Sequence, residues 1–108
     1  MNYILQYDEE LDIDFEIPEL DSTLEELLTD TVMSNNHEIR VALVSALRHG
    51  IEMKYIRVPV FAVKDSDFVF TLFNTEYSDQ VDKCITYFSS IEEYETCADL
   101  QKLKQLLS

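Results

Sequence analysis

Apolar and acidic residues alternate strictly in the stretch Leu11-Asp12-Ile13-Asp14-Phe15-Glu16-Ile17, on which the fold prediction depends. A period of two places successive side chains on opposite faces, so the stretch predicts a β-strand with one buried and one charged face. Tyr3, Leu5 and Tyr7 alternate in the same way just before the acidic turn Asp8-Glu9-Glu10. The N-terminal residues therefore predict a β-hairpin that ends at Pro18.

Two helices are predicted after this hairpin. Ser22 and Glu25 have the spacing of a capping box, and the residues that follow repeat at helical intervals (Leu24, Leu27, Leu28 and Val32). A second helix is predicted to begin at Asn35 or Asn36 and to run to Gly50, with Ile39, Leu43 and Leu47 on its apolar face. Gly50 is the only glycine, and its position predicts a left-handed C-terminal cap.

A second hairpin is predicted from the β-branched and aromatic segments 51–63 and 68–73, joined by the turn Asp65-Ser66-Asp67. Because Pro59 cannot donate a ladder hydrogen bond, its strand is predicted to lie at an edge or to contain a bulge. Two helices should follow. One carries Tyr77, Val81, Cys84, Ile85 and Phe88, and the other begins at a Ser90–Glu93 capping box and turns Ile91, Tyr94, Cys97, Leu100, Leu103 and Leu107 inward.

These elements predict one α+β domain spanning residues 1–108. A chain of 108 residues with 46% hydrophobic content suffices for a single core. The expected order is ββααββαα, with two hairpins forming an antiparallel sheet and four helices packed on one side of it. No targeting signal or membrane span is recognisable in the sequence, which favours a cytoplasmic location.

Charge is distributed very unevenly along the chain. The sequence holds 22 Asp and Glu against 8 Lys and Arg, a formal net charge of −14. Residues 1–39 contain twelve acidic residues and no Lys or Arg, whereas residues 40–64 contain five basic residues and a single acid. Such an excess destabilises a compact state through self-repulsion, so either solubility or a cationic partner must favour it.

The candidate binding residues are eight carboxylates in the N-terminal segment. Asp12, Asp14 and Glu16 should share one strand face at a repeat of roughly 6.6 Å, which resembles the phosphate spacing of a nucleic-acid strand. The alternative is a solvated face that the chain neutralises itself through its middle segment (Arg40, Arg48, Lys54, Arg57 and Lys64). The full candidate set is Asp8, Glu9, Glu10, Asp12, Asp14, Glu16, Glu19 and Asp21.

The residues that would support catalysis or cofactor binding are scarce. One glycine cannot build a phosphate-cradling loop, and His37 and His49 lie in no nucleophile motif. Cys84 and Cys97 fall at core-like helical positions, which predicts buried reduced thiols, with a disulfide as the alternative. The four His and Cys residues lack zinc-site spacing, and Asp12-x-Asp14-x-Glu16 lacks the glycine of a calcium loop. We therefore expect no enzyme activity, no cofactor and no metal.

The leading functional hypothesis is an inhibitor of a basic protein that binds nucleic acid, such as a nuclease. The carboxylate row would occupy a groove that normally holds DNA or RNA, as expected of a phage counter-defence protein, an immunity protein or an antitoxin. Direct binding to nucleic acid or to membranes is not expected. The alternative is an adaptor or chaperone-like protein that binds a peptide through Tyr3, Tyr7, Tyr55 and the Pro59 strand, or that pairs two copies of the chain as a homodimer.

Overall fold

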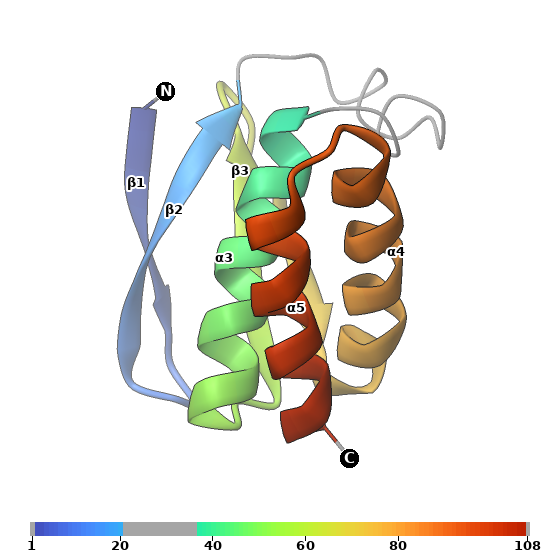
Figure 1. The fold of residues 1–108 in the computed structure, drawn as a ribbon. Helices are drawn as coiled ribbons and strands as arrows, with labels where there is room; N and C mark the ends of the chain where they lie inside the picture. Colours follow the sequence, from blue (N-terminus) through green and yellow to red (C-terminus); the bar gives the residue numbers. More distant parts are fainter. Residues whose placement is uncertain (1, 21–36, 108) are drawn as a thin grey trace.

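Helix α3 (His37–Met53) connects the two halves of the sheet and packs directly on it. The computed structural model describes residues 2–20 and 37–107 (Figure 1). The first half of the sheet consists of β1 (Asn2–Asp8) and β2 (Ile13–Leu20), and the second of β3 (Arg57–Val63) and β4 (Val69–Phe73). A short 3-10 helix η1 (Asn74–Glu76), α4 (Tyr77–Ser90) and α5 (Tyr94–Leu106) complete the chain.

The strand order is β1-β2-β3-β4, and the sheet is mixed. The hairpins β1–β2 and β3–β4 are antiparallel, as predicted, but β2 and β3 run parallel. The prediction of an antiparallel sheet was therefore wrong. Its physical reason is the connection: a helix between β2 and β3 returns the chain to the end of the sheet where β2 began, and parallel strands require such a crossover.

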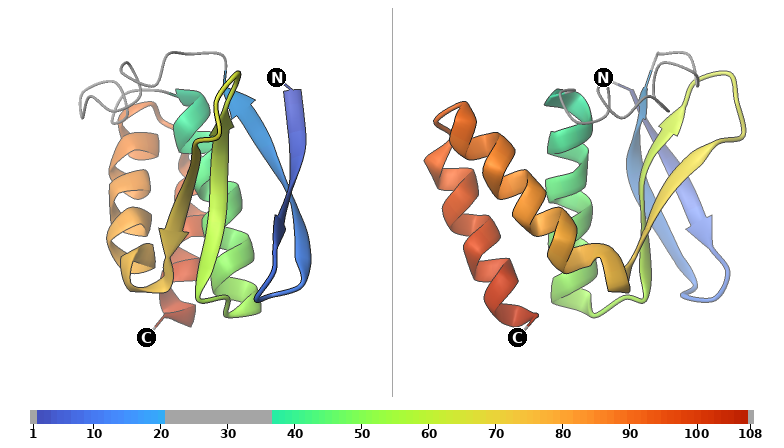
Figure 2. Two further views of the ribbon diagram at one scale, coloured as in Figure 1. Left: turned by 180° about the vertical axis from the view of Figure 1, so that it is seen from behind. Right: turned by 90° about the vertical axis from the view of Figure 1, so that its right-hand side faces the viewer.

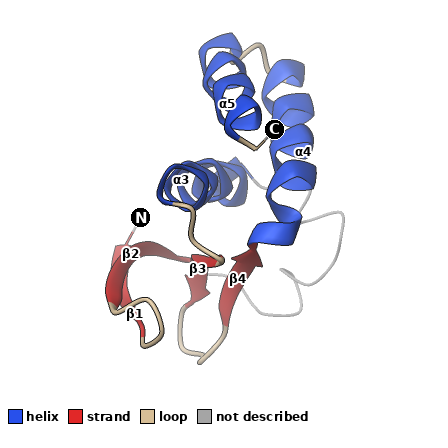
Figure 3. Ribbon diagram, turned by 90° about the horizontal axis from the view of Figure 1, so that it is seen from below, coloured by secondary structure: helices blue, strands red, loops and turns tan. Residues whose placement is uncertain are grey.

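The described residues contain three α-helices in the order ββαββαα, where the sequence predicted four in the order ββααββαα. The helix predicted from Ser22 and the candidate residue Asp21 lie outside the described residues. The helices occupy one side of the sheet, with α3 between the strands and the α4–α5 pair (Figures 2 and 3). The α+β class and the one-sided arrangement of the described helices are confirmed.

The core lies on both sides of α3. Its residues Ile39, Leu43 and Leu47 are buried, and so are Ala42 and Ala46, because the helix contacts both the sheet and the α4–α5 pair. Strand β3 is buried along nearly its whole length. Fully burying a Leu, Val or Phe side chain stabilises a fold by about 1.5–3 kcal/mol, so α3 and β3 supply much of the stability.

Both proline predictions need correction. Pro18 lies inside β2, where it is the register partner of Tyr3, and the strand continues to Leu20. Pro59 lies on β3, an interior strand, so the predicted edge position was wrong. The second alternative holds, because the β3–β4 register shifts between Pro59 and Phe61, which accommodates the missing N–H.

Gly50 was predicted to be the left-handed C-terminal cap of its helix, but it lies within α3, three residues before the helix ends. The residue with positive φ is Lys54 at 58°, and the N–H groups of Lys54 and Tyr55 donate to the carbonyls of Ile51 and Gly50 in a Schellman arrangement. Gly50 is required by space: an added Cβ would lie 2.5 Å from the Tyr77 hydroxyl. That hydroxyl donates to the Tyr55 carbonyl at 2.8 Å, and burial raises the pKa of Tyr77 to about 12.

The C-terminal helices also differ from the prediction in detail. Ser90 does not form the predicted capping box, because its hydroxyl donates to the Tyr87 carbonyl at the end of α4 and Glu93 makes no capping hydrogen bond. Leu100 and Leu103 are buried as predicted. Ile91, Tyr94 and Leu107 were predicted to point inward but are exposed.

We predict that Gly50→Ala destabilises the protein by about 1–3 kcal/mol, the usual cost of overpacking a filled core. The change would ordinarily stabilise a helix interior by about 0.5–1 kcal/mol, so a loss of stability has the opposite sign to the propensity effect. Urea unfolding followed by circular dichroism measures the difference. Ser45→Ala, at an exposed α3 position, is the control, and an equal gain in stability for both variants would contradict the packing argument.

Candidate functional site

The candidate site is the β1–β2 hairpin with its connecting turn, residues 2–20, which we call the acidic ribbon. Its two strands pair along their whole length, from Asn2 opposite Glu19 to Asp8 opposite Ile13. In contrast, the ribbon pairs with β3 through β2 at only two positions, Glu19 with Ala62 and Leu20 with Val63. One end of the ribbon is therefore joined to the sheet by backbone pairing, and the turn end is not.

Arg57 connects the turn end of the ribbon to β3. Its guanidinium donates to both carboxylate oxygens of Asp8 at 2.9 Å and to Glu10 at 3.2 Å. A hollow of about 230 Å³ lies beside this contact, lined by Gln6 and Asp8 of β1 and by Pro59 of β3. The bidentate geometry of the Arg57–Asp8 pair is of the kind that fixes orientation as well as neutralising charge.

Asp8 also organises the turn. Only 11% of its side chain is exposed, and it accepts hydrogen bonds from the backbone N–H groups of Glu10 and Leu11. The Leu11 N–H contributes most to lowering the pKa of Asp8 below its ordinary value of 3.8; burial opposes this, and the Arg57 guanidinium and the Glu10 N–H add to it. Asp8 therefore stabilises the turn and the contact with β3, and Glu10 binds the same Arg57 guanidinium.

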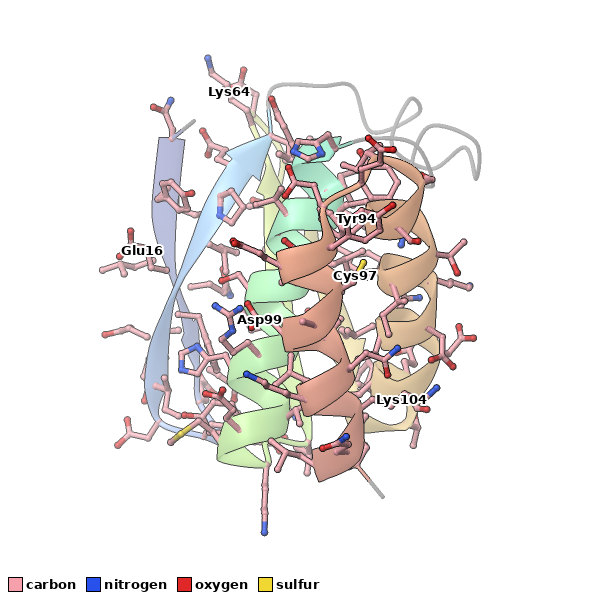
Figure 4. All side chains as sticks on the ribbon, in the orientation of Figure 1. Glu16, Lys64, Tyr94, Cys97, Asp99 and Lys104 are labelled. Atoms are coloured by element: carbon pink, nitrogen blue, oxygen red, sulfur yellow. The ribbon has the colours of Figure 1, made fainter. Side chains whose placement is uncertain are left out.

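Asp14 and Glu16 form the exposed charged face of β2. Both side chains are exposed, and neither is in an ion pair with any Lys or Arg among the described residues. Two residues apart on a strand, they repeat at roughly 6.6 Å. Figure 4 shows Glu16 on the outer side of the ribbon, turned away from the helices.

Asp12 does not belong to this strand face, contrary to the prediction. It lies in the turn before β2 with φ of 53°, a conformation for which Asp is better suited than most residues. Its carboxylate accepts a hydrogen bond from the Tyr7 hydroxyl at 2.7 Å, and this bond raises the pKa of Tyr7. Tyr7 therefore contacts Asp12 in the turn and is also the register partner of Asp14 in β2.

The other candidate residues are placed less favourably. Glu9 is exposed at the turn, and Glu19 is half-buried at the junction with β3. The structure thus divides the set into three groups. Asp8 and Glu10 are neutralised by Arg57, Glu19 belongs to the sheet junction, and Glu9, Asp12, Asp14 and Glu16 face solvent.

Tyr3 and Tyr7, which the adaptor alternative named as binding residues, form an exposed apolar row on β1 together with Leu5. Tyr3, Leu5 and Tyr7 are 58%, 69% and 51% exposed, and their register partners are Pro18, Glu16 and Asp14. Directly paired residues project from the same side of an antiparallel pair, so the row lies beside the carboxylates. Leu5 was not named as a binding residue from the sequence, although its alternation with Tyr3 and Tyr7 places all three on one strand face.

The Cys and His side chains lie outside the ribbon, on the helices. The described Cys84 and Cys97 are free thiols; burial raises the pKa of the Cys84 thiol, and Arg40 opposes the shift. His37 Nδ1 lies 2.9 Å from the Tyr87 hydroxyl, and the His49 ring packs against Phe15. Within residues 2–20 and 37–107, no group of three His, Cys, Asp or Glu is arranged to hold a metal ion.

Comparisons with protein-family models, curated proteins and solved structures found no match. No helix in the described part of the chain is long and apolar enough to cross a membrane.

We predict that Asp8→Asn lowers stability near neutral pH and has little effect in acid. A carboxyl group whose pKa is lowered by folding stabilises the fold above its ordinary pKa, 3.8 for Asp8, and this stabilisation is lost as the pH falls through the folded pKa. Urea unfolding of both proteins at about pH 7 and about pH 3 measures the effect. Asp67→Asn, an exposed carboxylate, is the control. A difference between wild type and Asp8→Asn that is the same at both pH values would contradict the ionic role.

Proposed function

We propose that this protein is a non-enzymatic inhibitor that binds a basic, nucleic-acid-binding protein through the acidic ribbon and so competes with the nucleic acid. The observation that carries the proposal is the pair of exposed carboxylates of Asp14 and Glu16 on β2, adjoined by Asp12 at the turn and by Glu9. Asp14 and Glu16 lie exposed on the strand, and Asp12 and Glu9 lie exposed in the adjoining turn, where a groove of another protein can reach them.

Among the described residues, none of the chain's own cations forms an ion pair with Asp14 or Glu16. All 8 Lys and Arg of the sequence lie among the described residues, since residues 21–36 contain none. Four pair with acids: Arg57 with Asp8 and Glu10, Arg48 with Asp99, Lys83 with Asp79, and Lys104 with Asp82. The predicted self-neutralisation of the ribbon by the middle segment therefore reduces to Arg57.

In the described structure, the three other cations of the middle segment are not ion-paired with the ribbon. Arg40 is buried, with its guanidinium 5.7 Å from the Tyr87 ring centre. Lys54 follows α3, and Lys64 follows β3 at the end of the sheet shown in Figure 4, where it lies beyond the level of Glu16. The negative potential at Asp14 and Glu16 is thus left for an external cation.

The chemistry of this face suits a groove lined with Lys and Arg. Carboxylates at roughly 6.6 Å intervals can engage cations that are arranged along a phosphate backbone. Oppositely charged surfaces associate faster at low salt, and exposed pairs are screened once the Debye length falls. A target whose groove is filled in this way cannot hold DNA or RNA at the same time, which is inhibition by mimicry.

A second candidate, an adaptor that pairs with an extended peptide, is supported by a different observation. Pro59 cannot provide the edge, because β3 is interior, but β1 is an edge strand and carries the exposed Tyr3 and Tyr7. Binding through apolar surface alone would persist at high ionic strength, which separates this candidate from mimicry.

We predict that Asp12→Asn, Asp14→Asn and Glu16→Gln together weaken target binding on the order of tenfold or more while leaving unfolding by urea nearly unchanged. The immobilised protein is exposed to a host lysate, and retained proteins are eluted with a short DNA duplex or with NaCl raised to about 1 M. Retained proteins should bind nucleic acid and should be released by both treatments.

The matched control removes three charges elsewhere. Glu52→Gln, Asp67→Asn and Glu92→Gln change exposed carboxylates on other elements by the same total charge. Equal loss of binding in both variants would indicate net charge and not the ribbon, and retention that neither DNA nor salt reverses would exclude mimicry.

A further inference from the structure

Strand β1 has one unpaired edge in the described structure. It is the first strand of the sheet, it pairs with β2 on one side, and its seven residues are extended throughout. An exposed edge of this length presents a row of backbone N–H and C=O groups to which another strand can bind. In Figure 3, β1 lies at the outer end of the sheet, away from the helices.

The side chains beside this edge are unusual for an unprotected edge strand. Natural edges are commonly blocked by lysine, proline or a bulge, but β1 carries exposed Tyr3, Leu5 and Tyr7 in regular register with β2. The adjoining strand adds the carboxylates of Glu16 and Asp14 opposite Leu5 and Tyr7. Backbone pairing groups, aromatic faces and negative charge therefore occur together.

We propose that β1 binds an extended, arginine-rich segment of the basic target by strand addition, so that the target segment becomes a fifth strand at this end of the sheet. This inference rests on the proposed function and names its mode of recognition. Backbone hydrogen bonds to β1 provide the affinity common to all sequences. Arginines at alternate positions stack on Tyr3 and Tyr7 and reach toward Asp14 and Glu16, which provides the selectivity.

Charge complementarity favours this occupant over a second copy of the chain. Two copies paired through β1 would bring two acidic ribbons together, each part of a chain with formal charge −14, and like charges that lie side by side are destabilising. The opposite edge strand, β4, has no comparable row: Phe73, at its end, is its one largely exposed apolar side chain.

The test uses a fluorescent seven-residue peptide, the length of β1, with arginine at every second position. Two further peptides carry N-methyl groups on the odd or on the even backbone amides, because alternate amides of a strand point to opposite edges. Strand addition predicts that one methylated peptide binds like the parent and that the other binds on the order of tenfold more weakly, measured by fluorescence anisotropy. Equal affinity for all three peptides, or no binding of the parent at low salt, overturns the proposal.

Two protein variants locate the binding edge. Leu5→Lys introduces a cation into the row and should weaken peptide binding on the order of tenfold, whereas Phe73→Lys makes the same charge change on β4 and should not. Equal effects of the two variants overturn the assignment to β1. A stable dimer in analytical ultracentrifugation that Leu5→Lys dissociates would assign the edge to a second copy, which also overturns it.

The outcomes separate this mode from the function on which it rests. If a DNA-displaceable target is retained from the lysate in a manner that depends on Asp14 and Glu16, but Leu5→Lys retains it equally well, the inhibitor function stands and strand addition fails. If the peptide binds β1 as predicted and DNA releases no retained target, strand recognition stands and mimicry fails.

Discussion

The burial of β3 between α3 and the neighbouring strands is the constraint on which the rest of the structure depends. The residues of β3 from Val58 to Val63 are buried, which fixes the strand inside the sheet and requires a neighbour on each side. β4 follows through a tight turn and supplies one neighbour. The other must come from the N-terminal hairpin, and because α3 separates the two, β2 arrives parallel.

This limited junction determines the character of the acidic ribbon. Pairing through Glu19 and Leu20 anchors one end, and the Arg57–Asp8 contact holds the other without backbone hydrogen bonds. The ribbon thus has two parts with different electrostatics. At its turn end Asp8 and Glu10 are neutralised by Arg57, whereas Asp14 and Glu16 on the outer face of β2 keep their charge, and β1 keeps a free edge beside them. A rigid position combined with uncompensated charge is what a binding surface for a cationic partner needs.

The helical layer differs from the ribbon in its use of charge. Asp79, Asp82 and Asp99 each pair with a cation on the same helix or a neighbouring one. Exposed pairs of this kind contribute little to stability, but they reduce the negative field on that side of the molecule. The ribbon itself contains no Lys or Arg, so its exposed carboxylates have no such partner on their own strands.

The sequence by itself determined the local elements: the alternation around Phe15 gave the first hairpin, the spacing of Ile39, Leu43 and Leu47 gave α3, and Asp65-Ser66-Asp67 gave the second turn. It also identified the acidic segment as the candidate site. It could not determine the strand order, the reason that position 50 must be glycine, or which carboxylates form ion pairs and which stay exposed. Those depend on contacts between residues far apart in the chain, such as Arg57 with Asp8 and Gly50 with Tyr77, and only the tertiary structure decides which side chains meet.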